Sequence, residues 1–187
     1  MGKLCKFGLV AVMAAVLPVA ATTLQKLTLP EMAQKSTAVV RARVKASAGV
    51  LRGTDVYTLY RLEPVEVWKA PAAGVPREVA VPGGVAGGLR QPVDGAPSLV
   101  EGREYVFFLW TSKKGLTQLI GLSQGLFDVR TAGGVPTVWR GAASERMLGA
   151  GGEPVRDEAV SMKLGDLKAQ VARALTGPIS GAGAGAR

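Results

Sequence analysis

Histidine is absent from this sequence of 187 residues, and cysteine occurs only once, at Cys5. Serine and cysteine hydrolases usually need a histidine as general base, and zinc enzymes hold their metal mainly through histidine or cysteine. The composition therefore excludes the usual forms of these enzymes. A lone cysteine also rules out a disulfide within the chain, so an apolar core and backbone hydrogen bonds must hold the fold. We predict a protein without enzymatic activity, catalytic residues, a bound metal or a cofactor.

No apolar run is long, and the longest stands near the start of the chain. It extends from Phe7 to Val19, follows two lysines and closes on the small residues Ala20 and Ala21. A helix needs about 20 apolar residues to span a bilayer, so this run is too short for a membrane anchor. The order of features is that of a secretory signal peptide. We predict a signal peptide over residues 1–21 and a mature protein that is secreted or periplasmic, with no membrane span after cleavage.

Acidic residues are fewer than basic ones, 14 against 23, which gives a formal net charge of +9. The cations are spread along the chain rather than gathered in one block. Such a balance favours weak attraction to anionic surfaces such as lipopolysaccharide, acidic glycans or nucleic acid. A solvated basic surface without a ligand is the plainer alternative. We expect no specific recognition of nucleic acid.

One domain is predicted between the signal peptide and a tail. It covers residues 22–176, and the Gly- and Ala-rich residues 177–187 have too little apolar bulk to become ordered. A short helix opens the domain, because Thr28 and Glu31 have the spacing of a capping box. Near the other end, apolar residues recur every three or four positions and predict a helix from about Gly165 to Leu175.

Alternation of apolar and polar residues over 40–47 predicts the clearest strand, with one buried face and one solvated face. The stretch from Val56 to Trp68 is predicted to pair antiparallel with it, with a bulge at Glu63–Pro64 that returns Val65 and Val67 to the buried face. Further short strands are predicted at Arg77–Val81, Tyr105–Trp110, Leu116–Leu122, Leu126–Arg130 and Val135–Arg140. Many short strands between glycine turns favour an all-β barrel or sandwich.

Basic side chains supply the candidate ligand-binding residues, which are Arg41, Arg43, Lys45 and Arg90. The first three form a row on the solvent face of one strand. Aromatic residues of the partner strand could add platforms for stacked bases, as in barrels that hold single-stranded nucleic acid. These aromatic residues are Tyr57, Tyr60 and Trp68. The plainer interpretation is that Glu63 or Glu66 pairs with the basic row and that the aromatic rings fill the core, and predicted export favours it.

A glycine-rich segment, residues 83–88, stands shortly before Arg90. It lacks the Lys-Ser/Thr ending and the following helix of a P-loop, so it is a poor phosphate cradle. We expect a turn that lets backbone segments pass close together, with Arg90 as an anion contact. Carboxylates near this segment, Asp94, Glu101 and Glu104, leave open a hydrolase that works with two acids, although no spacing singles out a pair.

Longer motifs resemble those of a group of exported bacterial proteins of unknown activity. They are Ser36–Val44, Tyr57–Lys69, Val81–Gly84, Glu101–Leu109 and Gly121–Phe127. The resemblance extends over roughly residues 29–130, which is most of the predicted mature domain. That group looks like the netrin/tissue-metalloprotease-inhibitor class of OB-like barrels. The resemblance implies a mainly β fold, a small OB-like antiparallel barrel with a short N-terminal helix and a C-terminal helix. It also implies a protein-binding role such as protease inhibition.

Inhibitors of that class present an N-terminal cysteine to the catalytic zinc of the protease, and the predicted mature chain has no cysteine. No inhibitory residue is therefore carried over from the resemblance. The predicted export, the positive charge and the missing catalytic residues favour a non-catalytic binding module for a protein partner or an anionic polymer. A protease-inhibitor-like protein that acts without cysteine is one alternative, and a carboxylate-based hydrolase is another.

Overall fold

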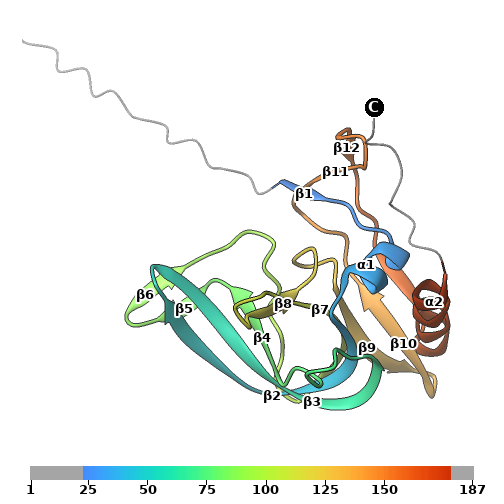
Figure 1. The fold of residues 1–187 in the computed structure, drawn as a ribbon, viewed down its shortest axis with the longest axis horizontal. Coiled ribbons are helices and arrows are strands. Elements are labelled where there is room, and N and C mark those ends of the chain that lie inside the picture. Colours follow the sequence, from blue (N-terminus) through green and yellow to red (C-terminus); the bar gives the residue numbers. More distant parts are fainter. Residues whose placement is uncertain (1–22, 178–187) are drawn as a thin grey trace, which may run out of the picture.

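Strands form most of the regular secondary structure in the described chain, which comprises residues 23–177 of a computed structural model (Figure 1). The predicted signal peptide, residues 1–21, and residues 178–187 of the predicted tail lie outside the described residues. The mainly β prediction is confirmed, and so are the short helix before the long strands and the C-terminal helix. Export, the single domain and disorder of the tail stay predictions.

The elements follow one another with strands between two helices. The helices are α1 (Leu29–Lys35) and α2 (Leu164–Thr176). The strands are β1 (Thr23–Gln25), β2 (Ala38–Arg52), β3 (Asp55–Lys69), β4 (Glu78–Pro82), β5 (Gly84–Ala86), β6 (Leu89–Gln91), β7 (Glu104–Thr111), β8 (Thr117–Leu119), β9 (Leu126–Ala132), β10 (Val135–Arg140), β11 (Arg146–Leu148), β12 (Pro154–Val155) and β13 (Val160–Lys163). Every strand and helix expected from the sequence is present, with ends that differ by a few residues. The sequence does not indicate β1, β5, β6, β11, β12 or β13, each of four residues or fewer, because alternation over so short a segment is weak evidence for a strand. Among the strands of this length, β8 is expected, within the longer predicted strand Leu116–Leu122.

The main sheet has eight strands, with the path β13-β10-β9-β7-β2-β3-β4 and with β8 paired to β7. Strands β2, β3 and β4 form a meander, and β7 returns to lie beside β2, which is the Greek-key arrangement. The sheet curls so that β8 lies beside β4, without ladder hydrogen bonds between them. Among the described strands, the hydrogen-bonded path is therefore open rather than closed into a ring.

The long hairpin of β2 and β3 curves because its pairing register shifts at three places. One shift lies between the pairs Arg41–Glu66 and Ala42–Pro64, so Val65 is the extra residue, next to the predicted bulge position. The predicted return of Val65 and Val67 to the buried face is wrong, because these side chains are 47% and 45% exposed. The neighbouring shifts change the alternation again, and the sequence pattern of β3 alone does not reveal them.

Two apolar clusters lie on opposite faces of β2 and β7. On β7, Phe107 and Leu109 belong to the cluster enclosed by the curved sheet, whereas Val106 and Phe108 belong to the other. The second cluster includes residues of both helices, so α1 and α2 cover that face of the sheet. Because both faces of β7 are buried, this strand is a nearly continuous apolar run.

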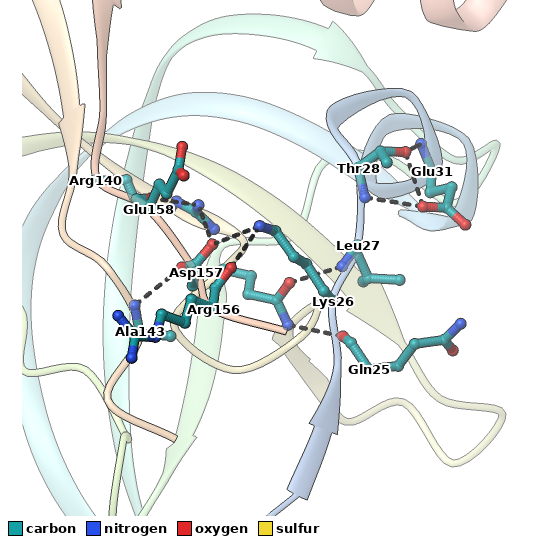
Figure 2. A network of polar contacts seen from close by, with 11 residues as sticks. Gln25, Lys26, Leu27, Thr28, Glu31, Arg140, Ala143, Arg156, Asp157 and Glu158 are labelled. Carbon is teal, nitrogen blue, oxygen red and sulfur yellow. Dashed lines mark hydrogen bonds and ion pairs between the residues drawn. The ribbon is translucent and has the colours of Figure 1, made fainter. Parts of the chain in front are cut away.

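Helix α1 is fixed at both of its ends. At the start, the Thr28 backbone N–H donates to Glu31 Oε2 (2.8 Å) and the Glu31 N–H donates to Thr28 Oγ1 (3.3 Å), as the capping box predicts (Figure 2). At the end, Lys69 Nζ donates to the carbonyl oxygens of Ala33 and Gln34 at 2.9 and 2.8 Å. The helix is therefore held by the last residue of β3 as well as by its own cap.

Figure 2 shows how the segment before α1 contacts residues that come much later in the chain, between Arg140 and Glu158. The carboxylate of Asp157, whose side chain is 1% exposed, accepts hydrogen bonds from Arg140 Nη2 and the Ala143 N–H, both at 2.9 Å. Lys26 Nζ donates to the carbonyl oxygen of Arg156 at 2.8 Å. The fully buried Gln124 adds two further contacts, to the Leu27 N–H at 2.8 Å and to the Gln25 carbonyl at 3.1 Å.

Candidate anion-binding cleft

The predicted basic row of β2 is present, but its cations are already paired with carboxylates. Glu104 on β7 accepts from Arg41 Nη2 and from Arg43 Nη2, each at 2.6 Å. Lys45 Nζ lies 3.5 Å from Glu63 Oε2, which confirms the interpretation that Glu63 pairs with the row. The row is therefore a ladder of ion pairs on the surface of the sheet.

The electrostatics of Glu104 reinforce this arrangement. Partial burial acts to raise the pKa of its carboxyl group, but hydrogen bonds from Arg41 and Arg43 outweigh burial and hold the pKa below the ordinary value. Glu104 stays charged at neutral pH and competes with any anion for the two guanidinium groups. Glu66, the other expected partner of the row, instead pairs with Lys168 of α2.

The aromatic residues beside the row form no open platform for bases. Tyr60 is buried in the first apolar cluster, where its hydroxyl accepts from the Leu99 N–H at 3.4 Å. Trp68 packs against the second cluster, and Tyr57 is half-buried. For Tyr60 and Trp68, the interpretation that the rings fill the interior is confirmed.

The glycine-rich segment forms the ribbon of β5 and β6, where a loop is expected from the sequence, and Arg90 is exposed on β6. The expected close passage of backbone is confirmed, because a Cβ atom on Gly49 of β2 would lie 1.8 Å from the Val85 carbonyl oxygen. Arg90 has no ion pair within residues 23–177. It is the one predicted ligand-binding residue whose charge is left uncompensated by the described residues.

A cleft of about 390 Å³ lies on β3 and β4, beside the loop between β7 and β8. Three exposed arginines line it, Arg52 at the end of β2, Arg61 on β3 and Arg77 just before β4. Pairing of β3 with β4 brings Arg61 opposite Glu78, and the Leu62 N–H donates to the Arg77 carbonyl at 2.7 Å. We call this site the arginine cleft (Arg52, Arg61, Arg77).

Positive charge dominates the arginine cleft. In the part of the chain that the structure describes, none of its three guanidinium groups forms an ion pair or a side-chain hydrogen bond. Glu78 is the one carboxylate of the lining, and two further cations, Lys113 and Lys114, directly precede the lining residue Gly115. Leu59, Ala80 and Leu116 supply apolar surface between these charges.

Such a cleft suits ligands that carry phosphate, sulfate or carboxylate groups. A guanidinium group presents several N–H donors in a planar fork that matches two oxygens of such an anion. The carboxylates considered for a hydrolase do not contribute, because neither Asp94, Glu101 nor Glu104 lines the cleft. Glu101 instead accepts from Ser47 Oγ at 2.7 Å. Residues 23–177 contain no cluster of three carboxylate side chains that could hold a metal ion.

A second cleft, of about 310 Å³, is lined by charged residues that mostly compensate one another. Asp128 Oδ2 accepts from Arg103 Nη2 at 2.6 Å and from Arg130 Nε at 2.7 Å. The Arg130 guanidinium also lies 4.6 Å from the ring centroid of Trp139. These pairings leave fewer free donors for an anion than the arginine cleft offers.

Comparison with protein-family models, with curated proteins and with solved structures finds no match for this chain. The resemblance to exported OB-like proteins therefore stays a prediction. Neither helix within residues 23–177 has the length and apolar character needed to cross a bilayer.

Sequence reasoning missed the arginine cleft because its members stand apart along the chain. Arg61 is a polar residue on a predicted strand, and Arg77 opens another predicted strand, so each had an ordinary explanation as a solvated side chain. The register of the β3–β4 pair could have revealed two of them. It places Arg61 opposite Glu78, the residue that directly follows Arg77. That register depends on bulges and turns that the amino-acid pattern does not define.

Proposed function

We propose that this protein is an exported, non-catalytic binding module that holds an anionic polymer in the arginine cleft. The observation that carries the proposal is the convergence of three exposed guanidinium groups around one cleft, none of which forms an ion pair within residues 23–177. Two ligand classes are expected from the sequence, a protein partner and an anionic polymer. The free guanidinium groups favour the polymer, because a chain of repeated anions can engage several of them at once.

The strand arrangement supports an OB-like barrel as the scaffold of this function. Strands β2, β3, β4 and β7 form the Greek key, and β8 lies beside β4 at the remaining opening. The OB-fold is a five-stranded, partly open Greek-key barrel that binds oligosaccharides or oligonucleotides on its second and third strands and the adjoining loops. The arginine cleft lies on the corresponding strands β3 and β4 and on the loop between β7 and β8.

The test is the affinity of the purified protein for a sulfated polysaccharide and for polyphosphate, measured by calorimetry at several salt concentrations. The triple variant Arg52→Ala/Arg61→Ala/Arg77→Ala should bind at least about tenfold more weakly, because each charge-assisted hydrogen bond contributes about 1.5–3 kcal/mol. Its affinity should also depend less steeply on salt, since fewer counterions are released on binding.

The matched control removes the same charge from elements that do not line the cleft, as Arg146→Ala/Arg156→Ala/Arg173→Ala. This control should retain most of the affinity. Equal weakening by both triple variants would assign the binding to overall charge rather than to the cleft. Absence of any salt-dependent binding by the unaltered protein would refute the proposed function itself.

A further inference from the structure

The β2–β3 hairpin meets the ribbon of β5 and β6 at one end of the molecule (Figure 1). Leu51, Val85 and Leu89 are 48%, 53% and 53% exposed, and we call them the apolar tip. In the register of the ribbon Leu89 pairs with Ala86 and Val85 pairs with Arg90, so Leu89 and Val85 extend from opposite faces of the ribbon at this end. Exposed large apolar side chains commonly mark a surface that another molecule covers. Leu51 comes from the hairpin and the other two from the ribbon, so two chain turns contribute to one end.

The ribbon is held firmly against the hairpin rather than standing free. The Val56 N–H donates to Gln91 Oε1 at 2.7 Å, and Thr58 Oγ1 donates to the Gly83 carbonyl at 2.9 Å. Gly84 has a positive φ of 123°, and a Cβ atom there would lie 2.3 Å from Thr58 Oγ1. These contacts between side chains and backbone fix the base of the ribbon, and Val85 stays exposed near its turn.

Cations stand directly beside the apolar tip. Arg52 follows Leu51 and also lines the arginine cleft, and Arg90 follows Leu89. Neither arginine has an ion pair within residues 23–177. Asp55 is the one acidic residue in the hairpin turn and the ribbon, so this end carries a net positive charge.

The apolar side chains and the neighbouring arginines together fit a lipid surface better than a dissolved polymer. A dissolved polyanion would contact the arginines and leave the aliphatic side chains in water. At an anionic membrane, apolar side chains can enter the boundary between headgroups and acyl chains while neighbouring cations contact the phosphates. The charge of the tip is therefore complementary to such a surface, and its aliphatic side chains find an apolar medium there.

We infer that this protein binds the surface of membranes that contain anionic lipids, with the apolar tip at the headgroup–acyl boundary and the arginine cleft on lipid phosphates. The inference rests on the proposed function, because the arginine cleft supplies the contact with the anion. It adds a second ligand, anionic lipid assembled in a bilayer, and a second contact surface outside the cleft.

The experiment compares co-sedimentation with phosphatidylglycerol/phosphatidylcholine vesicles, co-sedimentation with pure phosphatidylcholine vesicles, and calorimetric binding of a soluble sulfated polysaccharide. The tip variant Val85→Ser/Leu89→Ser should lose at least about tenfold in binding to the anionic vesicles, because it removes the buried apolar surface. Its binding to the polysaccharide should equal that of the unaltered protein, since the cleft arginines remain.

The matched control Val100→Ser/Val135→Ser replaces two other exposed valines, 51% and 44% exposed, that lie outside the tip, and it should bind both ligands normally. The cleft variant Arg61→Ala/Arg77→Ala should lose both. Polysaccharide binding without vesicle binding, or unimpaired vesicle binding by the tip variant, would overturn the lipid inference and leave the proposed function standing. Equal binding to uncharged vesicles would overturn the lipid inference too, whereas binding to neither ligand would refute both proposals.

Insertion of the tip can be observed directly with an environment-sensitive fluorophore on Leu89→Cys, in a chain whose Cys5 is replaced by serine. Anionic vesicles should shift the emission of this label to the blue. The same label on Val135→Cys, at the distant turn between β9 and β10, should keep its emission. An unshifted label at position 89 on a vesicle-bound protein would contradict insertion of the tip.

Discussion

At the scale of single residues, Asp157 illustrates how one charge can hold distant segments together. Its side chain is 1% exposed and bonds to Arg140 and to the Ala143 N–H, close to Lys26 of the N-terminal segment (Figure 2). A buried ion pair contributes little net stability, but removal of one partner leaves the other charge buried and uncompensated. If Asp157 were removed, the charge of Arg140, which is 9% exposed, would stay buried without its partner.

We expect Asp157→Ala to lower the free energy of unfolding by about 3–5 kcal/mol. The neighbouring Glu158→Ala is the matched control, because the Glu158 side chain is exposed and only its carbonyl oxygen contacts Arg140. That control should stay within about 0.5 kcal/mol of the unaltered protein. Urea unfolding followed by circular dichroism measures both, and similar losses in the two variants would contradict a structural role of the buried pair.

At the scale of elements, all the long strands could be predicted, whereas most of the strands of four residues or fewer could not. In β2, the buried Val40, Ala42 and Val44 confirm the predicted face, because their alternation is visible over many residues. The ribbon of β5 and β6 depends instead on the close approach of Gly49 to Val85, which lie far apart in the chain. The exposure of Val65 could not be predicted for a similar reason. The position of a bulge depends on the partner strand as much as on the residues of the bulged strand.

Helix α1 has only seven residues and would not form alone in water, so its cap contributes to its stability. We expect Thr28→Ala to lower the free energy of unfolding by about 1 kcal/mol, because the Glu31 N–H loses its side-chain acceptor. Thr28→Ser should retain most of the stability, since it keeps the hydroxyl group. Chemical denaturation of the three proteins tests this, and equal loss in the serine variant would contradict the capping explanation.

At the scale of the whole molecule, acid should weaken the fold through carboxylates whose pKa is lowered by hydrogen bonds in the folded state. Hydrogen bonds from Thr28 lower the pKa of Glu31, and the hydrogen bond from Lys168 lowers the pKa of Glu66. For Glu104, hydrogen bonds from Arg41 and Arg43 outweigh the opposing effect of burial, so its pKa is lowered as well. Each folded-state pKa lies below the unfolded value, so the associated stability is complete above the unfolded pKa and is lost at lower pH.

We therefore expect the free energy of unfolding to fall as the pH decreases below the ordinary glutamate pKa of 4.5. Glu104→Gln should make this fall shallower, because its side chain no longer binds a proton. Glu153→Gln changes an exposed glutamate that forms no ion pair with the other described residues, and it should keep the slope of the unaltered protein. Denaturant titrations between pH 3 and 7, an interval of about four units around that pKa, measure the slopes. An unchanged slope in Glu104→Gln would contradict the role of the β2–β7 ion pairs.

The sequence by itself determined the elements whose signal is local: the capped helix α1, the alternating strand β2, the apolar strand β7 and the absence of histidine chemistry. Only the tertiary structure decided which charges are paired and which are free. The predicted row of Arg41, Arg43 and Lys45 is neutralised by carboxylates that include Glu104 of a distant strand. Arg52, Arg61 and Arg77 instead meet around a cleft. The physical reason is that periodicity depends on neighbours in the chain, whereas charge pairing depends on strand register and loop packing between residues far apart.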